Sequence, residues 1–309
     1  MAPDLICMGE PLREFTEISN KEGENVYLPG FGGDISNCAI AAARQGLRVG
    51  LITALGDDRF GDDFMALWHS EGIDVSRVQR SANTPTGVYF VHPKPDGRDF
   101  TYLRKGSAAS QIKAEDVTDD YMTRAKVFFT SAISQAISAD ARRAVFHAIE
   151  VARSCGLQVA YDTNLRLQLW PLELARQTIH QTAGLCHVLL PSLDESMQLT
   201  GLCDPVEIAD FYLQLGPEVV ALKLGSRGSL VVTRERREFI PPVPVVAVDA
   251  TAAGDTFDGA FLAEYTLHGN PYHAAQYANT AAALATASLG AVSSIPGRSQ
   301  VIGLQKRCE

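Results

Sequence analysis

The chain alternates short apolar runs, rich in β-branched residues, with longer stretches whose apolar residues recur at a helical period. Parallel strands need long crossover connections, usually helices, so this alternation predicts a mainly parallel sheet covered on both faces. The expected strands are residues 5–8, 49–55, 127–130, 159–162, 188–190, 219–224 and 229–233. The expected helices are residues 36–45, 61–71, 139–155, 172–183, 193–199 and 205–215. The expected fold is α/β, with residues 1–309 forming one domain.

Two segments depart from this rhythm, because residues 13–31 and 87–104 alternate apolar and polar side chains at period two. Pro95-Asp96-Gly97 interrupts the second segment and is typical of a hairpin turn. We expect residues 12–31 and 86–105 to form a small β-sheet lid that projects from the main domain over a site at the strand ends. The alternative is a surface hairpin without a functional role.

Charge and composition restrict the partners of the chain. Its formal net charge is −9, and its basic cluster around Arg236 is interrupted by Glu235 and Glu238, which disfavours binding to nucleic acid. No apolar run approaches the about 20 residues needed to cross a bilayer, so no membrane partner is expected. The start of the sequence lacks the basic region of a signal peptide, and the six cysteines form no CxxC pair. These features predict a protein of the reducing cytoplasm.

The strongest chemical motif is the stretch from Val248 to Phe261. Small residues at 252–254 lead directly into a helical pattern, and the free amides at a helix N-terminus form an anion site. Asp255 would compete with a phosphate bound there, unless its carboxylate accepts a proton from an attacking hydroxyl. The alternative is that Asp255 only caps the helix.

Two glycine-containing patterns accompany this motif. Lys223-Leu-Gly-Ser-Arg-Gly228 follows an expected strand and permits a tight turn near a nucleotide, although by itself it fits an ordinary β-turn. Gly30-Phe-Gly-Gly-Asp-Ile-Ser-Asn37 opens an expected helix, and its carboxylate and amide groups suit recognition of sugar hydroxyls. The sequence has neither a Walker A motif nor a complete GxGxxG, which excludes a P-loop enzyme and disfavours a dinucleotide site.

These motifs, in this order and over nearly the whole chain, resemble the ribokinase/PfkB family of carbohydrate kinases. The resemblance implies an α/β core with a β lid, ATP as phosphoryl donor, and Asp255 as the base that deprotonates the acceptor hydroxyl. It implies that backbone amides at 252–254 hold the transferred phosphoryl group, contributed by Ala252, Ala253 and Gly254. Most members carry glycine where this chain has Ala252. Alanine keeps the backbone amide, so we expect the anion hole formed by these amides to survive if Ala252 has a φ below zero.

The same resemblance implies roles on the nucleotide side. Glu195 matches an acidic motif that organises Mg²⁺, and Ser192 stands where that motif often has asparagine. The nucleotide is expected to contact four further residues, namely Lys223, Gly225, Gly228 and Asn279. Asp249 and Thr251 are candidates for a monovalent cation such as K⁺, a question that the sequence leaves open. A homo-oligomer, a dimer through the lid, is also expected.

Three further stretches resemble the 2-keto-3-deoxygluconate kinases of that family: Gly87-Val-Tyr89, Phe100-Thr-Tyr-Leu-Arg104 and Tyr161-Asp-Thr-Asn-Leu-Arg166. That acceptor carries a carboxylate, which Arg104 and Arg166 could bind. The other expected acceptor contacts are Gly33, Asp34, Asn37, Tyr89 and Tyr102.

Several alternatives stay open at this point. Arg104 could be a surface charge of the lid. Arg166 could form a loop salt bridge or contact a nucleotide phosphate. Fructokinases share much of the pattern, and other sugar-acid kinases are further rivals. A non-catalytic sugar sensor is disfavoured because both Asp255 and Gly254 are present.

Overall fold

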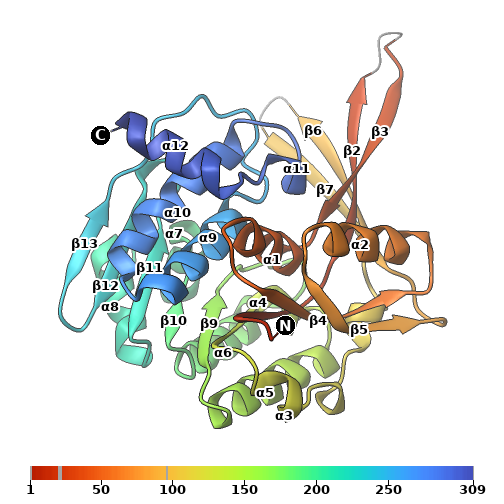
Figure 1. The fold of residues 1–309 in the computed structure, drawn as a ribbon, viewed down its shortest axis with the longest axis horizontal. Coiled ribbons are helices and arrows are strands. Elements are labelled where there is room, and N and C mark those ends of the chain that lie inside the picture. Colours follow the sequence, from red (N-terminus) through yellow and green to blue (C-terminus); the bar gives the residue numbers. More distant parts are fainter. Residues whose placement is uncertain (1, 20–22, 95–96, 309) are drawn as a thin grey trace.

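The fold is built on one large sheet, and the computed structural model describes residues 2–19, 23–94 and 97–308 (Figure 1). Its strand order is β13-β12-β11-β10-β9-β8-β1-β4-β5, and only β12 and β13 run antiparallel to their neighbours. The bounds are β1 (Leu5–Met8), β4 (Val49–Gly56), β5 (Asp74–Ser81), β8 (Val127–Ser131), β9 (Gln158–Asp162), β10 (Val188–Leu189), β11 (Val219–Lys223), β12 (Ser229–Thr233) and β13 (Arg237–Ile240). The α/β class expected from the sequence is confirmed.

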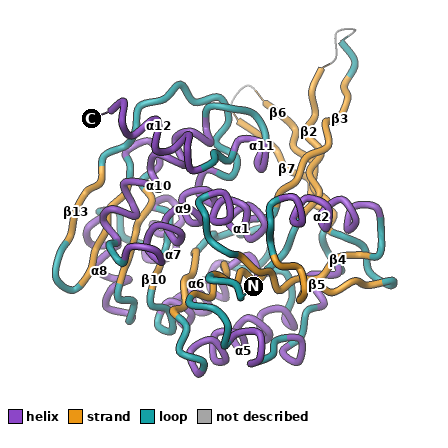
Figure 2. The backbone as a smooth tube through the Cα atoms, viewed as in Figure 1, coloured by secondary structure: helices purple, strands orange, loops and turns teal. Residues whose placement is uncertain are grey.

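Helices cover both faces of this sheet, as the purple coils on either side of the orange strands show in Figure 2. One face carries α3 (Asp119–Met122), α4 (Ala132–Ala136), α5 (Ala139–Ser154), α6 (Leu172–Ala183), α7 (Leu193–Thr200) and α8 (Pro205–Leu215). The other carries α1 (Asp34–Arg44), α2 (Arg59–Ser70), α9 (Ala253–His268), α10 (Pro271–Thr286), α11 (Ala291–Ser294) and α12 (Arg298–Cys308). Short 3₁₀ turns lie at η1 (Ala108–Gln111), η2 (Ala114–Asp116) and η3 (Gly225–Arg227).

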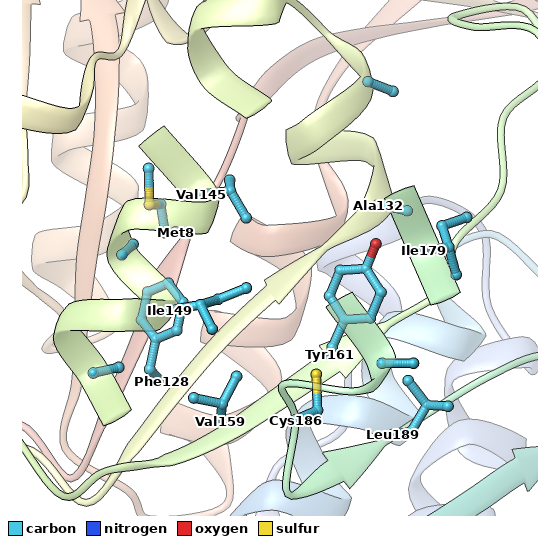
Figure 3. Close-up of a cluster of buried hydrophobic side chains, with 14 of the residues drawn as sticks. Met8, Phe128, Ala132, Val145, Ile149, Val159, Tyr161, Ile179, Cys186 and Leu189 are labelled. Atoms are coloured by element: carbon cyan, nitrogen blue, oxygen red, sulfur yellow. The ribbon is translucent and has the colours of Figure 1, made fainter. Parts of the chain in front are cut away.

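The core on the α5 side is packed with apolar side chains from several layers (Figure 3). Phe128 and Tyr161 come from neighbouring strands and are fully buried, with Phe128 beside Ile149 of α5 and Tyr161 on the side of Ile179 and Cys186 (Figure 3). The Tyr161 hydroxyl donates to Gln135 Oε1 at 2.6 Å, so the polar end of this core residue is satisfied. This packing fixes the end of β9. Asp162, which follows Tyr161 and is the last residue of β9, lines a cavity.

A second sheet of four strands projects from the core beside α2, at the upper right of Figure 1. Its strands are β2 (Leu12–Ser19), β3 (Asn25–Gly32), β6 (Gly87–Lys94) and β7 (Gly97–Leu103), and we call it the lid sheet. Its order is β3-β2-β6-β7, in which β2 and β6 are parallel and the outer pairs are antiparallel. The antiparallel β6–β7 pairing is the hairpin that the sequence predicts, although Pro95 and Asp96 of its turn lie outside the described residues.

The predicted elements agree closely with the observed ones, and α6, α8 and β12 begin and end at the expected residues. Two strands were not expected. Both β5 and β13 lie at the edges of the large sheet, where exposed side chains alternate with partly covered ones and obscure the apolar run. Within the described ranges, no helix is both long and apolar enough to span a bilayer.

Candidate active site

A cavity of about 1000 Å³ lies between the lid sheet and the carboxyl ends of the core strands. Asp162 and Lys223, which line it, are the last residues of β9 and β11. Tyr89 and Tyr102 line it from the lid sheet, and the first turn of α9 lines it from the core. Ligands of open α/β sheets characteristically bind in such a crevice outside the carboxyl ends of the strands.

Asp255 lies in the first turn of α9 and contributes its carboxylate to this cavity. Its Oδ2 accepts a hydrogen bond from Asn37 Nδ2 at 2.8 Å. Among the described residues no side chain caps α9, so Asp255 is not the capping residue of the alternative interpretation. Burial, reinforced by the negative charge of Asp34, raises the pKa of Asp255 to about 7. A carboxylate with a pKa near 7 is matched to general-base chemistry at neutral pH.

The backbone before Asp255 differs from the expectation at one residue. Ala252 has φ 60° and ψ 12°, so the condition stated for the anion hole, a φ below zero at Ala252, is not met. This left-handed conformation costs a non-glycine residue about 1–2 kcal/mol, and it is retained because Ala252 must turn the chain into α9. The amide of Ala253 donates to Ala250 O at 3.2 Å, which leaves the amides of Ala252 and Gly254 without a hydrogen bond to the described backbone. The expected hole therefore has two free amides of the three.

The start of α1 places Gly33, Asp34 and Asn37 on the cavity wall. Gly33 has φ 92°, and a Cβ there would lie 2.4 Å from the carbonyl oxygen of Glu10, so the chain turns too closely for a side chain. Asp34 accepts from the Ser131 hydroxyl and from Asn164 Nδ2, the latter at 3.2 Å.

Two oxygens on this wall have no hydrogen-bond partner in the described part of the chain. Within the described residues, Asp34 Oδ1 and Asn37 Oδ1 are buried without a hydrogen bond. Such groups are costly unless a ligand or water satisfies them. Acceptors of this kind suit the hydroxyl groups of a sugar.

The lid tyrosines form an aromatic wall. Tyr89 and Tyr102 stack with ring centroids 5.8 Å apart and an interplanar angle of 21°. The Tyr89 hydroxyl donates to the carboxylate of Glu14, so it offers an acceptor rather than a free donor to the cavity. Burial of its hydroxyl and the Glu14 charge raise the pKa of Tyr89.

Both arginines named as carboxylate receptors line the cavity, and both already pair with a glutamate. Arg104 is buried and pairs with Glu10, which excludes the surface-charge alternative. Arg166 donates through Nη1 to Glu195 Oε1 at 2.9 Å, so the loop salt bridge named as its alternative does form.

The expected magnesium residues, Glu195 and Ser192, also line the cavity. Glu195 accepts from Thr163 Oγ1 at 3.3 Å as well as from Arg166, and burial raises its pKa. In the described part of the chain, no three His, Cys, Asp or Glu side chains are grouped to hold a metal on their own. Mg²⁺ commonly uses one or two carboxylates together with water and substrate phosphates, so the carboxylate of Glu195 and the hydroxyl of Ser192 fit that ion.

Lys223, expected to lie along the nucleotide, lines the cavity, and its contact with a nucleotide stays a prediction. Its ammonium group is buried between two carboxylates, 2.9 Å from Asp258 Oδ1 and 3.2 Å from Asp162 Oδ2. The ammonium also lies 3.9 Å from where a Cβ on Gly254 would stand. Lys223 is therefore a fixed cation beside the start of α9.

The remaining predicted nucleotide residues lie outside the residues that line this cavity. Asn279 donates to the carbonyls of Ile240 and Pro241 at 3.2 and 3.1 Å. Gly225 has φ 61° and Gly228 φ 88°, and a Cβ on Gly228 would lie 2.2 Å from Ile240 O. These residues fix the turn beside β13, and their contact with a nucleotide stays a prediction.

Asp249, considered for a monovalent cation, accepts from the amides of Thr251 at 2.7 Å and Gly290 at 3.0 Å. Its carboxylate therefore ties together the two loops that lead into α9 and α11.

Sequence reasoning missed the buried partners of the predicted charges, above all Glu10, Asp162 and Asp258. The sequence does point to Asp162, because this residue ends an expected strand and belongs to the stretch Tyr161-Asp-Thr-Asn-Leu-Arg166. Asp258 was signalled too, since it follows Asp255 by three residues and so shares its helix face. Glu10 had no local signal.

Comparison with known proteins agrees with this geometry. Residues 4–298 match the description "pfkB family carbohydrate kinase". The 2-dehydro-3-deoxygluconokinase of Thermoproteus tenax is 33% identical, covering 94% of this chain and 91% of that protein. That of Bacillus subtilis is 32% identical, covering 97% and 95%, and the probable fructokinase-4 of Arabidopsis thaliana is 32% identical, covering 98% and 96%.

Solved structures share the fold. A PfkB protein from Polaromonas sp. superimposes with a TM-score of 0.87 at 30% identity, covering 98% of this chain and 99% of that one. A fructokinase with bound ATP from Xylella fastidiosa gives a TM-score of 0.90 at 25% identity, covering 99% of both chains. With a motif match over nearly its whole length and curated relatives above 30% identity, the chain belongs to the PfkB family of carbohydrate kinases.

Proposed function

We propose that the chain transfers the γ-phosphoryl group of ATP to a hydroxyl of a small sugar acid, with 2-keto-3-deoxygluconate as acceptor and its C6 hydroxyl as nucleophile. The observation that carries this proposal is the carboxylate of Asp255, held in the cavity by Asn37 directly beside the free amides of Ala252 and Gly254. A carboxylate beside an anion site suits phosphoryl transfer, because the carboxylate can deprotonate the attacking hydroxyl while the amides bind the phosphoryl oxygens.

In this proposal, Asp255 accepts the proton of the acceptor hydroxyl as its oxygen attacks the phosphorus. The amides of Ala252 and Gly254 donate to the phosphoryl oxygens, and the buried ammonium of Lys223 adds a positive charge close to Gly254. Closure of the lid sheet would exclude water and so limit hydrolysis of ATP.

ATP is supported as donor by the similarity to the ATP-bound fructokinase of Xylella fastidiosa. Glu195 and Ser192 would hold a hydrated Mg²⁺, which neutralises phosphate charge when bound. Asn279, Gly225 and Gly228 would lie beside the nucleotide at the turn they fix. A K⁺ ion near Asp249 would have to use groups other than the two amides that this carboxylate already accepts from.

A sugar acid is favoured by the two arginines on the cavity wall and by the two relatives named 2-dehydro-3-deoxygluconokinase. Arg104 keeps a buried Nε that has no partner among the described residues, and Arg166 is partly exposed to the cavity. These remaining donors suit a carboxylate, while Asp34 and Asn37 suit the hydroxyl groups.

Fructose is the second candidate acceptor, and one observation favours it. Because Glu10 neutralises Arg104 and Glu195 neutralises Arg166, the cavity carries less net positive charge than two bare arginines would provide. A neutral ketose is compatible with such a wall, and a probable fructokinase is among the similar proteins.

A coupled assay that follows ADP release over 2-keto-3-deoxygluconate, fructose, ribose, gluconate and adenosine tests the proposal. We expect the highest kcat/KM with 2-keto-3-deoxygluconate. Arg166→Ala should lower kcat/KM for the sugar acid about tenfold or more and change that for fructose far less, because only the acid loses a charge-assisted contact. Equal losses on both acceptors would assign Arg166 to phosphate binding or to structure.

A further inference from the structure

The four strands of the lid sheet all meet the core next to one residue, Glu10. Strand β2 begins two residues after it, at Leu12. Strand β3 leads into Gly33, where an added Cβ would lie 2.4 Å from the carbonyl oxygen of Glu10. At the start of β6, a Cβ on Gly87 would lie 3.2 Å from Glu10 Oε1. Strand β7 ends one residue before Arg104, which pairs with Glu10 Oε2.

Both carboxylate oxygens of Glu10 are bound to the chain that leaves the lid sheet. Oε2 pairs with Arg104 Nη2, and Oε1 accepts from the Ser107 hydroxyl at 2.7 Å. Glu10 has no exposed surface and Arg104 is 9% exposed, so this is a buried ion pair between core and lid. Removing one partner of such a pair leaves an uncompensated buried charge, so the two residues depend on each other.

Glu10 does not line the cavity, whereas Arg104 does. The Arg104 guanidinium lies 5.3 Å from the centroid of the Tyr102 ring, and its Nε has no partner among the described residues. With one edge of the guanidinium held by Glu10, Arg104 stays on the cavity wall and keeps a donor that no described residue uses. The guanidinium is thus held by a residue two positions after the end of β1.

We propose that Glu10 is a positioning residue, which anchors the root of the lid sheet to the core and orients Arg104 toward the acceptor. The part of this inference that concerns the acceptor rests on the proposed function. The anchoring of the lid root does not.

Kinetics of Glu10→Gln test the orientation of Arg104. This change keeps size and shape but removes the charge, and it should raise KM for the sugar acid about tenfold while kcat changes much less, because one charge-assisted contact becomes disordered. The double variant with Arg104→Ala should be no worse than Arg104→Ala alone, since Glu10 acts through Arg104. An unchanged or lowered KM, or additive losses in the double variant, would overturn the assignment.

Asp4→Asn is the matched control, because Asp4 directly precedes β1 and its largely buried carboxylate also pairs with an arginine, the half-exposed Arg48. It should leave KM for the acceptor unchanged. Ser107→Ala provides a milder variant if Glu10→Gln does not fold, and it should raise KM in the same direction by a smaller factor.

Hydrogen exchange of the unliganded chain tests the anchor independently of any acceptor. Glu10→Gln and Ser107→Ala should speed amide exchange in β7 and at Ser107, whose amide donates to Arg104 O at 3.0 Å, while Asp4→Asn should not. Unchanged exchange in both variants would refute the anchor. If the wild-type chain phosphorylated none of the acceptors, the proposed function would fail while this measurement still decided the role of Glu10.

Discussion

At Asp255, burial gives a weak acid the pKa of a useful base. The neighbouring Asp34 charge raises this pKa further, whereas the hydrogen bond from Asn37 and the charge of Lys223 lower it. The value of about 7 is the balance of these effects, so each neighbour is a means of changing it.

The pH dependence of the reaction follows from this balance. Asp255 accepts a proton only when ionised, so kcat/KM should rise with pH through the region of its pKa of about 7 and level off above it. Asn37→Ala removes a donor that stabilises the carboxylate, so its midpoint should move to higher pH, and activity at pH 6 should fall more than activity at pH 8. A pH–rate profile of both proteins checks this, and a midpoint that stays or moves to lower pH would contradict it.

At the level of elements, the sequence predicts which residues at strand ends and helix starts belong to the site. It does not predict the residues with which they form ion pairs. Apolar runs identify strands that are buried on both faces, which is why β12 was predicted exactly, whereas the polar edge strand β5 was missed. Motif residues such as Asp34 and Asp255 meet because α1 and α9 pack against each other and both begin at the cavity.

Glu10 and Arg104 are 94 residues apart, and no local pattern relates them. Their pairing depends on how the lid sheet returns to the core, which is a property of the tertiary fold. The left-handed Ala252 was likewise hidden, because alanine rarely adopts that conformation.

Lys223 joins three elements, since it ends β11 and pairs with Asp162 of β9 and Asp258 of α9. Lys223→Met would leave both carboxylates buried without a counter-charge and should cost about 3–5 kcal/mol of unfolding free energy at neutral pH. Burial already raises the pKa of Asp258, and without the lysine, whose charge lowers it, that pKa would rise further above its value in the unfolded chain. The loss should therefore be smaller at pH 5, where protonation removes the buried charges.

Thermal or denaturant unfolding at pH 5 and pH 8 measures this difference. Lys126→Met is the control, because Lys126 also pairs with an aspartate, Asp4, but has a largely exposed side chain. Its loss should stay within about 1 kcal/mol at either pH. Equal losses for the two lysine variants would show that the buried pair does not join the elements in the way we infer.

At the scale of the whole molecule, the lid sheet carries exposed apolar side chains, which include Leu28 and Tyr27 on β3 and Leu103 on β7. Edge strands with such side chains are prone to pair with another chain. We propose a dimer through the lid sheet, and sedimentation should give twice the chain mass. Leu28→Asp should shift the equilibrium toward monomer, whereas Leu267→Asp, at an exposed site on α9, should not. A monomeric wild-type chain would contradict the proposal.

The central claim is that Asp255 is the base and that the amides beside it hold the phosphoryl group. The most direct measurement compares kcat and ATP binding of the wild-type chain with those of Asp255→Asn, which keeps the shape of the side chain but accepts protons poorly. We predict that kcat falls by about three orders of magnitude or more while the Kd for ATP stays within about threefold. Turnover near the wild-type rate, with ATP binding intact, would contradict the account.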